Sequence, residues 1–541
     1  MRKSTKTRNA RTDIRPNALV SFAGARALDK EASAEWGLNP FALVEAAGRA
    51  CAEVFSRAFL RCPFSARHCP NIVALAGAGN NAADTLVMLR SLVLEGRIHS
   101  AACTVFISRL PQEEDGASVL ASAVIAARML GISVSAWDEE KAQGILADAD
   151  FIIDGIAGTG LDSPLSNIPG ARQAAFQMAE AVIALRAKRI LRRNRKRPLI
   201  ISVDIPSGIF DGWQPGMPAV AADATLAIEL QKLCLYTPAA RPLAGKILPV
   251  SGIFPAALTE KYREAEIVCW EEAARRIPLI PQTAYKYTRG LVEIRAGSPG
   301  ATGAARLAAL GTQAAGAGLV RLIVDPSLYH VIATASSGIM VVPDGCQTAE
   351  EDRFLPSAAL LGPGWGKRED RKRLLEAYLP LEEEGLPLIL DADAIAMAKG
   401  IVFHGNALLT PHPGEFAEYT GIPKETILAN PVPILRRFAE EKKVHILLKS
   451  HVLYAASPGG QIGIIDGMNP LLAAGGSGDV LAGFCAAIAA RTGNIYNSAC
   501  AAASLLIKAA EAKSIAGCFA DPAETANAAA FIAGKAWLPC I

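Results

Sequence analysis

Short apolar runs alternate with helical segments along the first half of the chain, and this alternation constrains the fold more than any other feature. Strand-like runs at 71–75, 102–107, 151–153 and 199–203 are separated by segments with helical spacing at 32–59, 83–94 and 117–130. Such alternation predicts a doubly wound parallel sheet. Asp154 and Asp204 directly follow two of the strand-like runs. Because ligands bind at the carboxyl ends of the strands in these sheets, both carboxylates are candidate site residues.

The second half starts the pattern again, which predicts a second domain of the same α/β class. Further strand-like runs lie at 291–295, 319–324, 387–390 and 445–448, and a glycine-rich stretch follows the first of them. A chain of 541 residues is too long for one ordinary core, and about 250 residues per domain is the natural division. Charged and proline-rich sequence at 258–282 marks the boundary. We therefore predict domains at 20–258 and 275–541, with no internal repeat relating them.

Charge and hydropathy exclude two classes of partner. The balance of 55 basic and 52 acidic residues gives a formal net charge of +3, which is too near neutral for a general nucleic-acid binder. The apolar stretches at 118–130 and 471–490 contain Arg128 and Asp479, and neither could cross about 30 Å of hydrocarbon without burying a charge. The basic run at 188–197 closes a helical segment and is interpreted as a solvated helix end.

Cysteine usage and the first residues favour a soluble protein of the cytoplasm. Eleven cysteines are scattered without a repeating framework, and Cys62 and Cys69 flank His68 with no second ligand pair at zinc-site spacing. Free thiols are therefore expected, as in a reducing compartment. The basic start at 1–15 lacks an apolar run after it and is predicted to be a frayed tail rather than a targeting signal.

The sharpest motif is the run GGSGDVLAG at 475–483, which is followed by an alanine-rich helical segment. Glycines let backbone N–H groups approach a phosphate, and the amino terminus of the following helix adds positive potential. Phosphate would repel Asp479 unless this carboxylate takes a proton from a hydroxyl while a phosphoryl group is transferred. The alternative is a glycine-rich turn with Asp479 as a helix cap. The segment alone does not decide between these interpretations.

Four other segments of this half place polar residues after strand-like runs. They are LGPGWG at 361–366, LDADA at 390–394, TPHPGEF at 410–416 and Lys449 after LL. Taken alone, each segment could have a purely structural role as a turn, a helix cap or a surface charge. Their order and their common position after strands make coincidence a poor explanation and favour an active site.

Together these strings resemble the ADP/ATP-dependent NAD(P)H-hydrate dehydratase over residues 285–490, which implies a ribokinase-like α/β domain. By this resemblance Asp479 is the catalytic base on the ring hydroxyl of the hydrate, and ADP or ATP with Mg2+ is the cofactor. Gly364 and His412 would contact the substrate. The residues implied in nucleotide binding are Lys449, Gly476, Ser477 and Gly478. One departure is Leu453, which stands where the family has a threonine.

The first half resembles the NAD(P)H-hydrate epimerase over residues 28–255, a Rossmann-like domain fused ahead of the dehydratase. The strings are VEAAGR at 44–49, GAGNN at 77–81, DGIAGTGL at 154–161 and VDIPSG at 203–208. The resemblance implies Asp204 as a catalytic residue and Asn81, Asp154 and Ser207 as ligands of potassium (K+). The residues implied in substrate binding are Asn80, Asn81, Asp84, Gly158, Thr159, Gly160, Leu161 and Pro164.

One loop of this half departs from the epimerase pattern. The family has NNGGDG where this chain has NNAADT, so Ala82, Ala83 and Thr85 replace glycines. If those glycines adopt positive φ, each Cβ costs on the order of 1 kcal/mol and obstructs the substrate's phosphates. We therefore expect weak or absent conversion of R- to S-hydrate.

The resemblance predicts a bifunctional enzyme that repairs NADHX and NADPHX, with an adenine nucleotide as co-substrate and with assembly into a homo-oligomer. Two alternatives stay open at this point. One is a dehydratase with a non-catalytic amino-terminal module, and the other is a small-molecule kinase of the ribokinase superfamily.

Overall fold

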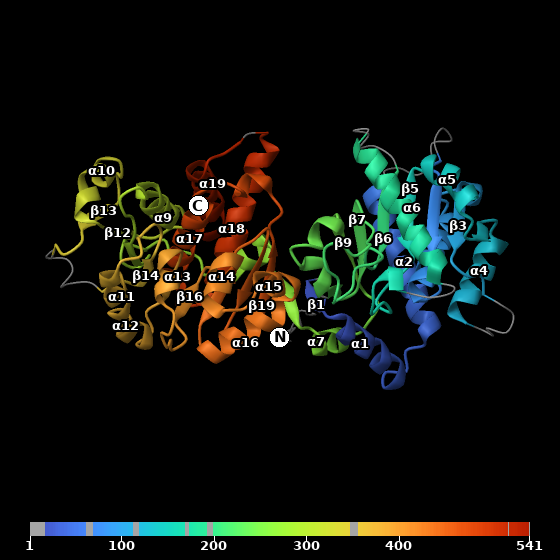
Figure 1. Ribbon diagram of the computed structural model, residues 1–541, viewed down its shortest axis with the longest axis horizontal. Helices are drawn as coiled ribbons and strands as arrows, with labels where there is room; N and C mark the ends of the chain where they lie inside the picture. Colours follow the sequence, from blue (N-terminus) through green and yellow to red (C-terminus); the bar gives the residue numbers. More distant parts are fainter. Residues whose placement is uncertain are drawn as a thin grey trace, which may run out of the picture. The chain divides into compact units, whose positions relative to one another are not determined.

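The computed structural model describes residues 17–60, 69–111, 118–167, 172–191, 198–346, 355–517 and 519–539. It divides into two compact units, Met1–Glu264 and Ala265–Ile541. Each unit contains a sheet with helices packed against it (Figure 1). None of the helices within these ranges is long and apolar enough to cross a membrane. The predicted tail at 1–15, the pair Cys62 and His68, and the end of the basic run at 192–197 lie outside the described residues.

The first unit is built on a parallel sheet with the strand order β4-β3-β2-β5-β6-β7-β9. The chain moves from β2 to β4 in one direction and from β5 to β9 in the other, so the order reverses between β2 and β5. Right-handed crossovers then place helices on both faces. The strands are β2 (Ile72–Ala76), β3 (Cys103–Ile107), β4 (Ser133–Ala136), β5 (Phe151–Gly155), β6 (Leu199–Val203), β7 (Ala224–Ile228) and β9 (Lys246–Val250).

The helices of the first unit pack as two groups. One group contains α2 (Pro40–Phe59), α3 (Asn80–Leu94) and α4 (Val119–Met129), and the other contains α5 (Glu139–Ala147) and α6 (Arg172–Leu191). Buried apolar side chains from α2, α3 and α4 form one core with the sheet. A smaller cluster lies under α1 (Phe22–Ala34), close to the short parallel pair β1 (Ala18–Val20) and β8 (Gln231–Lys232).

The second unit has a mixed sheet whose order runs β13-β12-β11-β14-β15-β16-β17-β18-β19-β10. It is parallel except for the pairings of β18 with β17 and β19, and the strand order reverses between β11 and β14. The strands are β10 (Ala265–Ile267), β11 (Leu291–Arg295), β12 (Leu319–Val324), β13 (Met340–Pro343), β14 (Ala358–Leu361), β15 (Leu388–Leu390), β16 (Ala407–Leu409), β17 (His445–Leu448), β18 (Val452–Ala456) and β19 (Ile462–Asp466).

The main core of the second unit lies between this sheet and a layer of four helices, α9 (Thr302–Ala314), α17 (Ser477–Thr492), α18 (Ile495–Ile515) and α19 (Pro522–Trp537). Glycines allow α9 and α17 to approach closely. A Cβ added to Gly311 would meet Val480 O at 2.5 Å, and one added to Gly483 would meet Ala308 O at 2.3 Å. This contact fixes α17, and with it the residues at its amino terminus.

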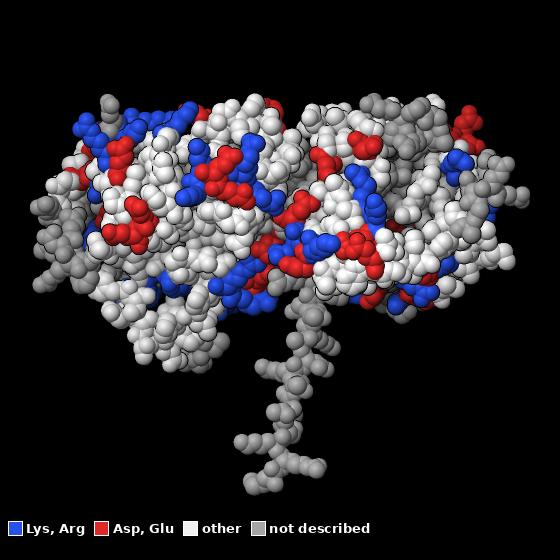
Figure 2. Space-filling model, turned by 90° about the horizontal axis from the view of Figure 1, so that it is seen from below, with Lys and Arg blue, Asp and Glu red and all other residues white. Residues whose placement is uncertain are grey.

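The predicted α/β class is confirmed in both units. Two predicted helices differ from the structure. The segment at 32–59 is split into α1 and α2, because the chain turns at Gly37 with φ +65° before Asn39 caps α2. Helix α3 begins at Asn80 rather than at Ala83. Basic and acidic side chains both occur on the face shown in Figure 2.

Candidate active sites

A cavity of about 710 Å³ lies at the carboxyl ends of β2 and β5 in the first unit, where the strand order reverses. This is the position at which doubly wound sheets bind their ligands. Most of the predicted substrate residues line it, whereas Pro164 does not. The lining includes Asn80, Asn81, Asp84, Gly158, Thr159, Gly160, Leu161 and Asp204.

The three predicted potassium ligands meet beside this cavity. Ser207 Oγ donates to Asp154 Oδ1 at 2.5 Å, and Ser202 Oγ donates to Asp154 Oδ2 at 2.7 Å. Asn81 Nδ2 donates to Ala157 O at 3.1 Å, while Asn81 Oδ1 is buried without a hydrogen-bond partner among the described residues. Asp154 is fully buried, and burial raises the pKa of its carboxyl although Ser207 and Ser202 donate to it.

Asp204 follows β6 in a strained conformation and forms an ion pair inside the cavity. Its φ is +66°, which an L residue rarely adopts, and such strain often occurs at functional sites. Lys232 Nζ donates to Asp204 Oδ1 at 2.5 Å and to Ile228 O at 2.9 Å. Asp84 is also buried, and its Oδ1 has no partner within the described ranges. Burial raises the pKa of Asp84 well above its usual value, and the charges of Asp204 and Asp29 raise it further.

The expected obstruction by Ala82, Ala83 and Thr85 is not present in the structure. All three residues lie in α3 without positive φ, and their side chains are buried. None of them lines the cavity, whereas Asn80, Asn81 and Asp84 of the same helix do. The predicted obstruction was wrong, because all three residues are helical and lie outside the cavity lining. Weak epimerisation is a separate point and stays a prediction.

Thr85 occupies space left by a glycine on the neighbouring strand. Its Oγ1 donates to Asn81 O at 2.9 Å, and a Cβ added to Gly155 would lie only 2.1 Å from this hydroxyl. Gly155 therefore accommodates Thr85 behind the cavity. The helix can keep its threonine without moving Asn81 or Asp84.

Three neighbouring strand ends of the second unit converge on one carboxylate. Asp391 follows β15, Thr410 follows β16 and Lys449 follows β17. Thr410 Oγ1 and Lys449 Nζ both donate to Asp391 Oδ1, at 2.7 and 2.5 Å. The charge and hydrogen bond of Asp391 raise the pKa of Lys449, although burial acts in the opposite direction. The lysine is therefore held as an ammonium in a fixed position.

This ion pair lies against the first turn of α17, where the glycine motif ends. Gly476 caps α17 with φ +100°, and a Cβ there would meet Leu307 Cδ1 at 2.4 Å. A Cβ on Gly478 would be 3.4 Å from Lys449 Nζ. Ser477 Oγ donates to Leu472 O at 3.0 Å, which holds the loop in place. The amino terminus of α17 and Lys449 thus present positive potential together.

Asp479 lies in the first turn of α17 and does not cap the helix. Its environment raises the pKa of its carboxyl to about 6, mainly through burial and also through the charge of Asp391, while Lys449 lowers it. A carboxyl with a pKa near neutrality can accept a proton from a hydroxyl and release it again.

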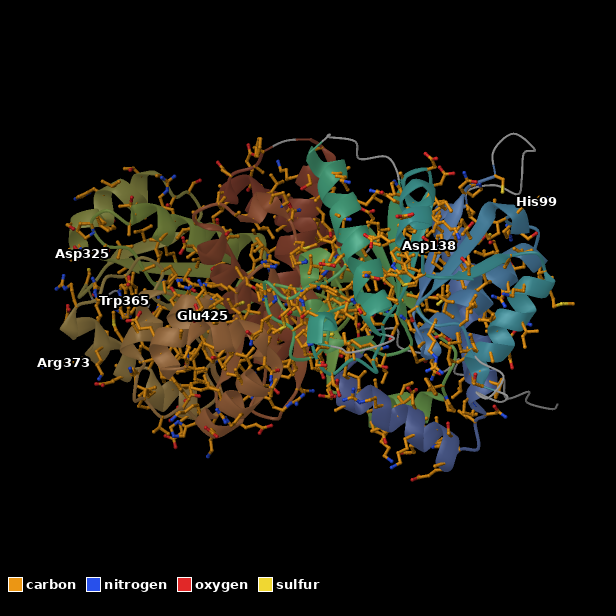
Figure 3. The ribbon with its side chains drawn as sticks, turned by 45° about the vertical axis from the view of Figure 1, so that its right-hand side comes forward. His99, Asp138, Asp325, Trp365, Arg373 and Glu425 are labelled. Atoms are coloured by element: carbon orange, nitrogen blue, oxygen red, sulfur yellow. The ribbon has the colours of Figure 1, made fainter. Side chains whose placement is uncertain are left out.

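The second glycine loop packs between two other loops. Gly362 has φ +121°, and a Cβ there would meet Asp391 O at 1.8 Å. Gly364 faces Ala301 and Ala304, and its carbonyl accepts from Ser298 Oγ at 2.9 Å. Trp365, labelled in Figure 3, is buried with the Arg371 guanidinium 5.2 Å from its ring centroid. Gly364 is thus held where strands β11 and β14 diverge.

His412 caps a helix as well as lying in the predicted substrate loop. Its Nδ1 accepts from Gly414 N at 3.0 Å and from Glu415 N at 3.2 Å at the start of α14 (Pro413–Thr420). Glu415 Oε2 accepts in turn from His412 N at 2.8 Å, which completes a capping box. The Nε2 edge of the imidazole lies 3.4 Å from Glu415 Oε1, and the side chain is exposed.

The sequence singled out some of the residues that organise these sites, but it did not show how they pair, and it missed Asp29. Leu453 is buried in β18 within the core, so its replacement of a threonine changes packing there. Thr410 and the ion pair of Asp391 with Lys449 could have been inferred, because all three follow strands. Asp29 on α1 and the Asp204–Lys232 pair carry no comparable signal, since their partners are distant in the sequence.

Comparisons with known proteins match family models to both halves of the chain. A family model described as NAD(P)H-hydrate dehydratase matches residues 292–528, and one described as YjeF-related protein N-terminus matches residues 40–234. The chain is 32% identical over 481 residues to the bifunctional NAD(P)H-hydrate repair enzyme of Gloeobacter violaceus, covering 85% of this chain and 86% of that protein. The enzyme of the same name from Escherichia coli is 28% identical over 478 residues, covering 87% and 85%.

A solved structure is also similar to the second unit. It is the ADP/ATP-dependent NAD(P)H-hydrate dehydratase of Bacillus subtilis co-crystallized with ATP/Mg2+, which is 26% identical and has a TM-score of 0.44. The match covers 50% of this chain and 98% of that one. With relatives aligned along both units, the predicted fusion of an epimerase-like and a dehydratase-like domain is confirmed. The chain therefore belongs to the family of bifunctional NAD(P)H-hydrate repair enzymes.

Proposed function

We propose that the second unit dehydrates S-NAD(P)HX with Asp479 as the general base. The observation that carries this proposal is the meeting of Asp391, Thr410 and Lys449 beside the glycine-bounded amino terminus of α17. The ring hydroxyl gives its proton to Asp479 while its oxygen bonds to the terminal phosphorus of the nucleotide. The bond from that phosphorus to the bridging oxygen breaks, and AMP leaves from ADP, or ADP from ATP. Loss of phosphate and of a neighbouring ring proton then restores the double bond. Lys449 and the start of α17 offset the charge on the phosphoryl group.

The nucleotide is proposed to lie along Gly476, Ser477, Gly478 and Lys449, with ADP or ATP as phosphoryl donor. Mg2+ would neutralise phosphate charge. In the part of the chain that the structure describes, no three His, Cys, Asp or Glu side chains form a metal cluster. Mg2+ characteristically keeps several waters and binds through substrate phosphates, so such a cluster is not required. Gly364 and His412 are proposed to contact the hydrate from neighbouring loops.

The first unit is proposed to interconvert R- and S-NAD(P)HX in its 710 Å³ cavity. Asn81 Oδ1 is buried and has no hydrogen-bond donor among the residues that the structure describes, and a potassium ion would satisfy this oxygen. Asn81, Asp154 and Ser207 would hold this ion, whose charge would favour phosphate binding nearby. The loop from Gly158 to Leu161 and the start of α3 would then bind the substrate's phosphates.

The test of the dehydratase is incubation of purified chain with S-NADHX, with and without ADP or ATP, while dihydropyridine absorbance is recorded. Recovery of NADH that depends on nucleotide, with one phosphate released per NADH, supports the proposal. Phosphorylated hydrate that accumulates without NADH would instead indicate a kinase. The proposed sites do not depend on location or assembly, and the cytoplasmic location and homo-oligomer remain predictions from the sequence.

A further inference from the structure

Four carboxylates from four separate elements line the cavity of the first unit. Asp29 comes from α1, Asp84 from α3, Asp204 from the turn after β6 and Glu229 from the residue after β7. Lys232 is paired with Asp204 at 2.5 Å. Asp29 has no part in the binding roles proposed above, yet it faces the same cavity.

The chemistry of epimerisation requires acid–base groups on two sides of the substrate ring. Water adds to an enamine at the carbon bonded to nitrogen, so the hydroxyl of the hydrate is on the carbon next to the ring nitrogen. The two epimers present this hydroxyl on opposite faces of the ring. A general acid or base must lie within hydrogen-bond reach of the atom to which it transfers a proton. A single carboxyl on one face of the ring therefore cannot serve the hydroxyl oxygen of both epimers.

Helix α1 holds Asp29 in place over the cavity. Ser21 caps the helix, and its backbone N–H donates to Glu264 Oε1 at 2.8 Å. The N–H of Phe22 donates to Asp211 Oδ2 at 2.8 Å, and Arg26 Nη1 donates to Thr159 O at 2.9 Å on the substrate loop. Leu28, next to Asp29, is buried in the cluster beneath the helix. The backbone around Asp29 is thus anchored at several points.

The charges around Asp29 suit proton transfer. Asp29 lines the cavity but stays exposed to solvent, and partial desolvation there raises the pKa of its carboxyl to about 6, while Lys232 lowers this pKa and Asp204 raises it. Both members of the Asp204–Lys232 pair are therefore close enough to influence Asp29 electrostatically. The other titratable side chains that line the cavity are Arg26, Asp84, Arg109 and Glu229.

Building on the epimerase role proposed above, we infer that Asp29 is a catalytic residue and acts on the ring face opposite to Asp204. The protonated carboxyl of Asp29 gives its proton to the hydroxyl oxygen, and the ring nitrogen's electron pair forms a C=N bond as water leaves. Water then adds to the opposite face and forms a new C–O bond, while its extra proton passes to Asp204. The return of one proton from Asp204 to Asp29 through solvent completes the cycle, and no other reactant is consumed.

The test is Asp29→Asn in the full chain, assayed by R-to-S exchange with chromatographic separation of the epimers. We expect kcat to fall about 10²-fold or more with little change in KM. Wild-type kcat/KM should fall as pH rises through about 6, because Asp29 acts as an acid, and the variant should lack this limb. Asp29→Glu should restore part of the rate.

Two controls separate this inference from a failure of folding or of the epimerase assignment. Glu35→Gln removes an exposed carboxylate just after α1 and should leave epimerisation unchanged. Dehydration of S-hydrate by the other unit should be unchanged in both variants. Wild-type exchange together with an Asp29→Asn rate within twofold of it would overturn the role of Asp29 alone. No wild-type acceleration over the uncatalysed rate would overturn the epimerase function as well.

Discussion

In the first unit the strand order reverses between β2 and β5, and in the second it reverses between β11 and β14. The first site is a cavity of about 710 Å³ whose lining includes several carboxylates. The second places one buried carboxylate, Asp391, in an ion pair and leaves Asp479 beside a glycine-bounded helix start. Both sites thus lie at the carboxyl ends of strands, the first at the reversal point and the second after β15, β16 and β17. The loops that follow the strands determine which charged groups each site contains.

This difference between the two sites indicates whether each reaction needs a co-substrate. The cavity of the first unit has carboxylates on several sides, which suits a reaction that moves protons and consumes no co-substrate. The second site has a fixed cation and a helix start, which suits a site completed by phosphates. Each reaction should therefore fail separately when its own unit is altered.

The largest expected effect is that of Asp479→Asn on dehydration. We expect the rate to fall about 10²-fold or more while nucleotide binding changes little, because the base is lost and the phosphate site is kept. Wild-type kcat/KM should rise with pH through about 6, because the base must be ionised, and the variant should lack this rise. Epimerisation by the same protein is the matched control. Near-normal turnover of S-hydrate would show that Asp479 is not the base.

The Asn81→Ala substitution should impair epimerisation, because Asn81 lies at the proposed potassium site of the first unit. Removal of the unpaired Oδ1 deprives the proposed potassium ion of a ligand, and epimerisation should fall about tenfold or more. Titration with KCl against a background of a bulky organic cation measures the ion requirement. The wild type should be stimulated by potassium and the variant should respond weakly. Equal stimulation of both proteins would remove Asn81 from the ion site.

Gly155→Ala should destabilise the first unit. The new Cβ would lie 2.1 Å from Thr85 Oγ1, and such overpacking typically costs about 1–3 kcal/mol. Denaturant unfolding of the full chain, followed by Trp137 and Trp213 fluorescence changes in single-tryptophan backgrounds, would measure the loss. Thr85→Gly combined with Gly155→Ala should recover part of it, because the clash is removed. Additive losses in the double variant would argue against this packing.

The smallest expected effects are those of Ala82→Gly and Ala83→Gly. Both residues are helical and buried, so each change should cost about 1 kcal/mol of stability and give no gain in epimerisation. Ala147→Gly, at the end of α5, is a control for glycine in a helix remote from the cavity. A faster epimerase after either change would restore the original steric argument.

The sequence predicted the strand ends better than the helix starts. Strands at 199–203, 291–295, 319–324 and 445–448 are found at the predicted residues, because short β-branched runs before a polar residue are distinctive. Asp154, Asp204 and Lys449 therefore lie at strand ends as expected. The start of α3 could not be placed, because Gly79 caps the helix without a side-chain hydrogen bond. The predicted start at Ala83 left Asn80, Asn81 and Ala82 in a loop, whereas the structure places them in the first turn of α3.

The rest of the site depends on contacts between distant segments. Asp204 and Lys232 are 28 residues apart, and Lys449 and Asp391 are 58 apart. The positions of Asp391 and Lys449 after strands of one sheet hint at their pairing, whereas no local pattern links Asp204 with Lys232. His412 shows a further difficulty, since the same side chain is a helix cap and a candidate for substrate contact. Sequence motifs indicate which loops form the site. The hydrogen bonds in the structure show which side-chain atoms are already engaged and which can contact a ligand.

The central claim is that one chain carries two separate sites that act in sequence, and purified R-NADHX tests it most directly. With nucleotide present, wild-type protein should convert R-hydrate to NADH faster than uncatalysed epimerisation allows. With the Asp479→Asn variant, the reaction should stop at a mixture of R- and S-NADHX, because only the first unit remains active. Conversion of R-hydrate by the wild type at no more than the uncatalysed epimerisation rate would contradict the account.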